Sequence, residues 1–299
     1  DVERGMACPV VWRGLRRRGR WPVAGCGLAA VRVGCGALVL AAWCWGLSAG
    51  AWAAGRVASL NLCADQLVLQ LADRADIIGL TPLARDCTES VLCDQAKQVP
   101  VLPAKAETVL AAHPSVLLAS PYSARLAVRA AREAGAKVVM LPPASSLADV
   151  PVQIMRVAQA VGQVERGHQL VAAFEARLVA LSIPISPTAP VAAVYEANGL
   201  VVHAGSLPND ILTHAGLRNF ATVTGMGQAG GRVPLAVLLV RRPDLLVRAK
   251  SGPGQSVAQA LLDHPVLLAA FPPPHVAAVP PRSWLCGLPQ PPAALAFPR

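Results

Sequence analysis

The chain has few aromatic and few charged residues for its length. Of its 299 residues, 4% are aromatic and 15% are charged, whereas 54% are hydrophobic. The high hydrophobic share excludes a disordered chain, because such chains cannot bury enough apolar surface to fold. The shortage of aromatic residues favours helices packed on buried parallel strands over a β-sandwich.

Several motifs that would indicate specific chemistry are also missing. No G-x-S-x-G occurs, which is the turn that carries the nucleophile of an α/β-hydrolase. No C-x-x-C occurs, so the cysteines give no zinc signature and we expect no metal site. G-x-G-x-x-G is matched only at Gly225–Gly230, after no strong strand pattern, which does not indicate a dinucleotide cofactor. We therefore expect no catalytic residues and no cofactor, with an exported α/β enzyme as the alternative.

A basic cluster interleaved with aromatic residues is missing as well, although the net charge is +10. Residues 1–55 hold seven arginines and two acids, and the remaining residues hold 20 basic and 15 acidic groups. The positive charge of that larger part is spread thinly, so we expect no nucleic-acid partner.

The first 54 residues have the order of a secretory signal peptide. Arginines crowd residues 13–20, an uncharged apolar segment spans residues 33–47, and small residues follow. This is the order of an export signal, and the apolar segment is short for a membrane span, which needs about 20 residues. We expect cleavage near Ala53 or Ala54 and a periplasmic protein. An uncleaved N-terminal anchor is the alternative.

After the leader, strand and helix patterns alternate in two blocks. Residues 55–145 form the first block, opening with the apolar run Val57–Leu60, and residues 183–299 form the second. Between them, residues 146–182 carry apolar side chains at helical spacing, with Gly162 as a point where the run can bend. Alternating strands and helices imply parallel sheets with right-handed crossovers. The sequence therefore predicts an α/β fold of two parallel-sheet lobes joined by one long connecting helix.

The ordered set of segments resembles a known family over roughly residues 56–287. The segments are RVASLNLCADQL at 56–67, AETVLAAHPSVLLA at 106–119, GRVPLAVLLVRRPDLLV at 231–247 and SWLCG at 283–287. In these segments and in the helical connector, the chain resembles the periplasmic substrate-binding proteins of iron–siderophore and vitamin B12 (cobalamin) ABC importers.

That resemblance implies a ligand cleft between the two lobes and a protein that is not an enzyme. Such a protein captures a metal chelate, here a ferric siderophore or a cobalamin-type corrinoid, and delivers it to a permease in the inner membrane. We expect it to act as a monomer. A related receptor that has lost its transport function is a further alternative.

The resemblance also implies one docking glutamate on each lobe, facing arginines of the permease. The first matches Glu107, in the helix before His113 and Pro114. In the matching helix of the second block, Ala236 stands where the glutamate is expected. Docking through Glu107 is therefore implied, and docking through the second lobe is left open.

Loops at the carboxyl ends of the strands should line the cleft, since ligands of open α/β sheets bind there. Concave sites favour aromatic walls with a few polar groups, and a guanidinium would pair with an anionic chelate. The residues that we expect to bind the ligand are Asn61, Leu62, Cys63, Tyr122, Tyr195, Asn198, Gly199, Arg232 and Trp284. The alternative for the aromatic rings is that they cover the edges of a core.

Four cysteines follow the leader, and an oxidising periplasm leaves three disulfide pairings open to them. Cys87 and Cys93 flank a short loop and could close on each other. Cys63 and Cys286 would then remain, each on a predicted site loop. Free, buried thiols are the alternative for any of the four.

Overall fold

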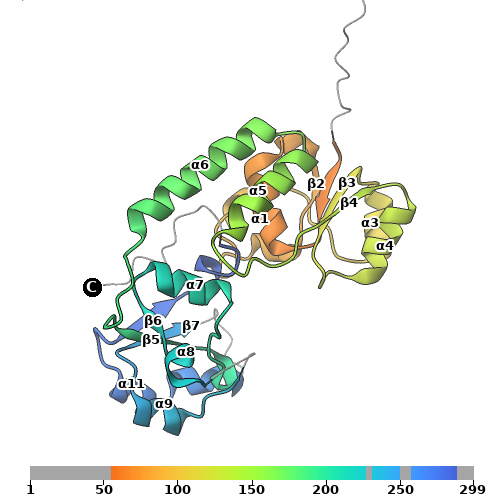
Figure 1. The fold of residues 1–299 in the computed structure, drawn as a ribbon. Coiled ribbons are helices and arrows are strands. Elements are labelled where there is room, and N and C mark those ends of the chain that lie inside the picture. Colours follow the sequence, from red (N-terminus) through yellow and green to blue (C-terminus); the bar gives the residue numbers. More distant parts are fainter. Residues whose placement is uncertain (1–54, 227–230, 250–256, 288–299) are drawn as a thin grey trace, which may run out of the picture. The chain divides into compact units, whose positions relative to one another are not determined.

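The structure, a computed structural model, describes residues 55–226, 231–249 and 257–287 (Figure 1). The predicted leader lies outside these residues, as do residues 227–230 of the glycine motif. Within the described part, no helix combines the length and the apolar character that a membrane span requires.

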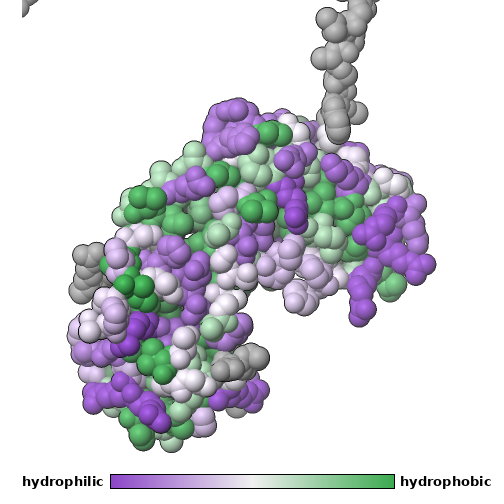
Figure 2. All heavy atoms as spheres, in the orientation of Figure 1, coloured by the Kyte–Doolittle hydropathy of each residue, from purple (hydrophilic) through white to green (hydrophobic). Residues whose placement is uncertain are grey.

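The first lobe is built on a four-stranded parallel sheet with the strand order β2-β1-β3-β4. Its strands are β1 (Val57–Ser59), β2 (Ile77–Gly79), β3 (Val116–Ala119) and β4 (Lys137–Met140). Its helices are α1 (Leu62–Leu71), α2 (Cys93–Ala96), α3 (Ala106–Ala112) and α4 (Arg125–Glu133). Hydrophilic side chains gather over α4 in Figure 2, where Arg125, Arg129 and Arg132 are exposed.

Both faces of this sheet are covered, because successive residues of a strand point to opposite sides. Ala58 and Leu117 belong to a core cluster that includes residues of α3 and α4. Their neighbours Val57 and Leu118 belong to a second cluster, with residues of α1 and of the helix α5 (Asp149–Ala160). Figure 1 shows α3 and α4 beside one face of the sheet and α1 and α5 beside the other. Burial on both faces explains why these strands are apolar throughout.

The second lobe repeats the same topology, with the strand order β6-β5-β7-β8 and parallel pairing throughout. Its strands are β5 (Val191–Tyr195), β6 (Arg218–Asn219), β7 (Leu245–Ala249) and β8 (Val276–Val279). Its helices are α7 (Leu207–His214), α8 (Phe220–Thr224), α9 (Leu235–Arg241), α10 (Val257–Ala260) and α11 (Pro265–Ala270). The predicted α/β class with two parallel-sheet lobes is confirmed.

Two helices fill the range that the sequence assigns to the connector. The helix α5 packs on the first lobe, and α6 (Val164–Leu181) is the long helix that leads to the second. Gly162 separates them with a φ of 73°, in the left-handed region that glycine adopts without strain. The possible bend at Gly162 is therefore a complete break in the helix.

Asn198 and Gly199 form a tight turn shortly after β5. Both residues have positive φ, as this pair favours. The residues after the turn form single antiparallel bridges, from Val201 to Tyr195 and from Leu200 to Arg232.

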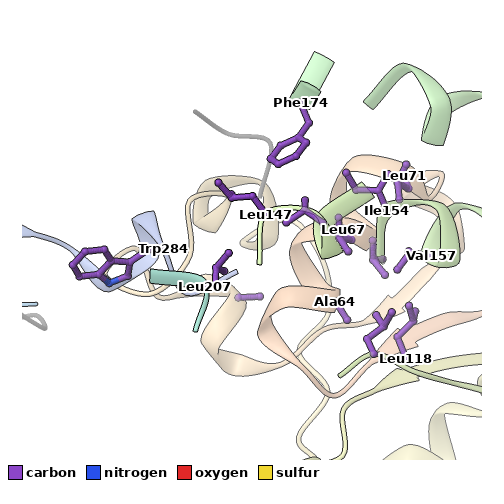
Figure 3. Packing of buried hydrophobic residues seen from close by; sticks show 14 of the residues in the cluster. Ala64, Leu67, Leu71, Leu118, Leu147, Ile154, Val157, Phe174, Leu207 and Trp284 are labelled. Atoms are coloured by element: carbon purple, nitrogen blue, oxygen red, sulfur yellow. The ribbon is translucent and has the colours of Figure 1, made fainter. Parts of the chain in front are cut away.

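One hydrophobic cluster is common to both lobes. It joins residues under the first sheet, such as Leu67 and Ile154, to Leu207 of α7 and to Trp284, and Figure 3 shows these side chains in one view. A polar contact accompanies it, since the Leu147 amide donates to the Asp210 carboxylate at 2.7 Å. The lobes therefore meet through packed apolar side chains and not only through the connecting helix.

Candidate ligand-binding site

Each sheet has a point at which the strand order reverses direction. This point lies between β1 and β3 in the first lobe and between β5 and β7 in the second. Ligands of open α/β sheets bind beyond the carboxyl ends of the strands at such a reversal. The segments that leave these strands are therefore the first place to look for a site.

A pocket of about 510 Å³ lies among segments that follow β4, β5 and β8. Its size falls within the roughly 300–1,000 Å³ of small-molecule sites. Both lobes contribute to its lining, which consists of Pro143, Ala144, Ser145, Glu196, Ala197, His203, Gly205, Ser206, Leu207, Pro208, Pro281, Trp284 and Leu285. Most of these side chains are apolar or small, and the polar groups are few.

The wall from the first lobe is held by a carboxylate. One oxygen of Asp149 accepts hydrogen bonds from the amide and hydroxyl of Ser145, both at 2.8 Å, and from the Ser146 amide at 2.9 Å. These hydrogen bonds, those from Ser145 above all, lower the pKa of the Asp149 carboxyl. They fix the turn that leads from β4 into α5, and with it the position of Ser145.

The wall from the second lobe is the start of α7. Ser206 caps this helix, because its hydroxyl accepts from the Asn209 amide at 3.4 Å and donates to the His203 carbonyl at 2.7 Å. The cap fixes the short segment that carries His203 to the pocket.

The third wall is tied to α1 by a disulfide. Cys286 follows the pocket residues Trp284 and Leu285 and is bonded to Cys63 in the first turn of α1. The buried Gln66 amide donates to the Cys286 sulfur at 3.5 Å, and its oxygen accepts from the Val91 amide at 3.2 Å. This wall therefore cannot leave α1 without breaking a covalent bond and exposing a buried amide.

A second disulfide joins Cys87 and Cys93 nearby. Arg282 donates to the Cys87 carbonyl at 2.5 Å, so this loop also contacts the segment after β8. Cys87, Cys93 and Asp94 are the group of potential metal-binding side chains found in the described ranges. Their two sulfurs are bonded to each other, and thiolates are what a metal needs from cysteine.

Glu196 and His203 are the titratable side chains in the pocket lining. Glu196 follows β5 directly and is partly buried, and burial raises the pKa of its carboxyl. The Nδ1 atom of His203 lies 2.7 Å from the Ala204 carbonyl. Because a carbonyl only accepts, Nδ1 carries the proton, and Nε2 of the neutral ring is left as an acceptor.

A further buried carboxyl, Asp65, lies in α1 beside the disulfide-bonded Cys63. The Thr81 hydroxyl and amide donate to one of its oxygens at 2.5 and 3.3 Å. Burial raises its pKa to about 7, although these hydrogen bonds act in the opposite direction. Asp65 is fully buried and is not part of the pocket lining. Its hydrogen bonds to Thr81 hold the loop after β2 against α1.

Of the residues predicted to bind the ligand, Trp284 lines the pocket. Asn61, Leu62 and Cys63 begin α1, where the Asn61 side chain accepts from the Cys63 and Ala64 amides at 3.1 Å. Asn61 is therefore a helix cap, which satisfies two amides that would otherwise lack a partner.

The structure does not bring the other predicted residues to this pocket. Tyr195 is fully buried in the second lobe, where its hydroxyl donates to the Val233 carbonyl at 2.9 Å, and Gly199 is buried beside it. Asn198 and Arg232 are exposed, and Tyr122 is 84% exposed on the loop after β3. None of the five belongs to the lining.

Glu196 and His203 line the pocket but are not among the residues that the sequence predicts to bind the ligand. The signal for Glu196 was present, because an acidic residue directly after an apolar strand lies at the carboxyl end of the sheet. The contribution of residues 143–145 had no such signal, since it depends on how β4 leads into α5.

Comparisons with known proteins agree with this architecture. The family model described as "Periplasmic binding protein" matches residues 57–281. The structure is similar to the periplasmic haem-binding protein RhuT from Roseiflexus sp. RS-1 in its apo form, with a TM-score of 0.66 and 21% identity over 81% of this chain and 95% of that one. A periplasmic haem-binding protein from Pseudomonas aeruginosa gives a TM-score of 0.61 and 22% identity, over 81% and 90% of the two chains.

A periplasmic binding protein from Veillonella parvula gives a TM-score of 0.64 at 16% identity, over 81% of this chain and 88% of that one. A search of curated proteins finds no match. At identities of 16–22% the solved structures establish the fold alone. The family model matches more than half of the chain, and it is therefore the comparison that bears on the family.

Proposed function

The chain belongs to the periplasmic binding protein family, as its resemblance predicts, and from this premise we propose that it is the solute-binding component of an ABC importer. It is exported by its N-terminal signal peptide and captures a metal chelate in the periplasm. It then delivers the chelate to a permease in the inner membrane and does no chemistry on it.

One observation carries the proposal: the pocket is lined by residues from both lobes and lies at the carboxyl ends of their strands. A ligand held there would contact both lobes at once. Trp284 would provide an aromatic wall, and Glu196 and His203 would provide polar contacts. A hydrolase would need a serine hydroxyl bonded to the side chain of a histidine base. The two serines of the lining donate instead to the Asp149 carboxylate and to the His203 carbonyl.

The ligand class is a ferric siderophore, a cobalamin-type corrinoid or a haem. The first two come from the sequence resemblance. Haem joins them because similar structures are named as haem-binding proteins, at identities that leave the ligand of this chain open.

Permease docking involves Glu107, which is exposed in the first turn of α3. Ala236 is likewise exposed, in the first turn of α9. We propose that the first lobe makes the ionic contact and that the second lobe docks without one. Replacing Glu107 by alanine should lower chelate uptake by cells and leave chelate binding by the purified protein unchanged.

The experiment that tests the function is a ligand screen on protein recovered from the periplasm. Calorimetric titration with haemin, cyanocobalamin and ferric siderophores should identify at least one chelate that binds with micromolar affinity or better. Trp284 is the one tryptophan after residue 54, so its emission should change on binding. If no chelate in the panel gives a heat or an emission change, the proposed function is wrong.

A further inference from the structure

Glu196 is a partly buried acid of the pocket lining whose carboxylate has no partner within the described residues. Asp149 accepts from Ser145, and Asp65 accepts from Thr81. For the Glu196 carboxylate, no hydrogen bond or ion pair is found within the described residues, and only its backbone is paired, to Leu200 at 2.8 Å. Burial is the sole cause that raises the pKa of Glu196. Its ionised form is therefore less well stabilised than in water, and no side chain among the described residues offsets that loss.

No cation from the described residues is available in this pocket. Neither lysine nor arginine lines it. Arg85 donates to the carbonyls of Ala96 and Val99, and Arg282 donates to the Cys87 carbonyl. His203 is the other titratable group of the lining, and no ion pair joins it to Glu196 in the described part of the chain. The described residues therefore supply no positive partner for Glu196, and a cationic ligand would supply one.

The position of Glu196 suits it to contact a ligand. It directly follows β5, and the Gly199 amide donates to its carbonyl at 3.1 Å, so its backbone is fixed on both sides. The lining around it is mostly apolar, with Leu207, Pro281 and Trp284 among its members. A charge pair in such surroundings is stronger than one in open water, because the effective dielectric constant is lower.

We propose that Glu196 makes the pocket selective for chelates that carry a positive charge, by pairing its carboxylate with a cationic group such as an ammonium on the ligand. This inference rests on the proposed function and narrows its ligand class. A hydrogen bond between two charged groups should favour a cationic chelate over a neutral one of the same shape by roughly tenfold in affinity.

Two ferric tris-hydroxamates test this selectivity. Ferrioxamine B carries a terminal ammonium, whereas the cyclic ferrioxamine E has the same type of iron centre and no charge. Protein from the periplasm should bind ferrioxamine B about tenfold more tightly in calorimetric titrations. The variant Glu196→Gln, which keeps the shape and removes the charge, should lose that preference by weakening ferrioxamine B alone. The control Glu175→Gln removes an exposed charge of α6, outside the pocket, and should keep the preference.

The outcomes separate the inference from the function. Equal affinities in the wild type, or a preference that survives in Glu196→Gln, would overturn the role of Glu196 and leave chelate capture standing. Binding of haemin or cyanocobalamin without ferrioxamine B would do the same, since neither of them is cationic. Absence of binding to all four chelates would overturn both proposals.

Discussion

The disulfide between Cys63 and Cys286 should stabilise the protein far more than the one between Cys87 and Cys93. The first pair is separated by 223 residues and the second by 6. A crosslink restricts the unfolded chain in proportion to the logarithm of the loop that it closes. Replacing each pair by serines therefore gives two variants of the same chemistry whose loops differ greatly in length.

The loop-closure relation turns these separations into free energies of unfolding. It gives about 5 kcal/mol for 223 residues and about 2 kcal/mol for 6 residues at 25 °C. At about 2–4 °C per kcal/mol for a domain of this size, the loss of the long-range disulfide corresponds to roughly 10–20 °C in Tm. Serine at position 286 keeps an acceptor for the buried Gln66 amide, which donates to the Cys286 sulfur, so the loss reports mainly the crosslink.

Urea denaturation of the two double-serine variants and the wild type measures these free energies. Thiol titration of denatured wild-type protein from the periplasm provides the control, and it should detect no free thiol. Equal losses in the two variants would refute the loop-length reasoning, as would a larger loss from the Cys87–Cys93 pair. Two free thiols per molecule in the wild type would refute one of the disulfides themselves.

Three further substitutions test the described structure. Asp65 has a pKa of about 7 in the folded protein against an ordinary 3.8, so the folded state holds the extra proton between these values. The free energy of unfolding that Asp65 contributes is full below about pH 4 and falls by roughly 4 kcal/mol as the pH rises to 7. In urea denaturations at a series of pH values, Asp65→Asn should remove this fall. Gly199→Ala should lower the free energy of unfolding by roughly 2 kcal/mol, because φ is 74° and the new carbon would lie 3.0 Å from both the Tyr195 hydroxyl and the Val233 carbonyl. An unchanged denaturation midpoint would contradict this. Tyr195→Phe should cost about 1 kcal/mol by removing one buried hydrogen bond and leave chelate affinity unchanged, whereas a weaker chelate complex in calorimetry would return Tyr195 to the ligand site.

The fold could be predicted from the sequence because its signals are local. Strands buried on both faces appear as short apolar runs, as in Val57–Leu60, and the helices between them have apolar residues at helical spacing. The sequence pattern did not decide whether the long helical run bends or breaks. The range 146–182 has one continuous helical pattern, and only the left-handed φ of Gly162 divides it.

The site was harder to predict, since successive residues at a strand end point to opposite faces. Tyr195 and Glu196 are neighbours, yet the tyrosine enters the core and the glutamate lines the pocket. The pattern favoured the aromatic residue, but its hydroxyl has a partner 38 residues away, at Val233. No local signal reveals such a partner. Trp284 was predicted because its loop follows the last strand, and in the structure it lies in the pocket lining.

The hydrophobic cluster common to the two lobes has a consequence for how the chain unfolds. Each sheet has one face covered by a cluster within its own lobe and the other face covered by the cluster that both share. A lobe produced alone would expose the shared face to water. The two lobes should therefore melt in a single calorimetric transition whose calorimetric and van't Hoff enthalpies agree. The two lobes together, and not either lobe alone, would then be the smallest unit that folds independently.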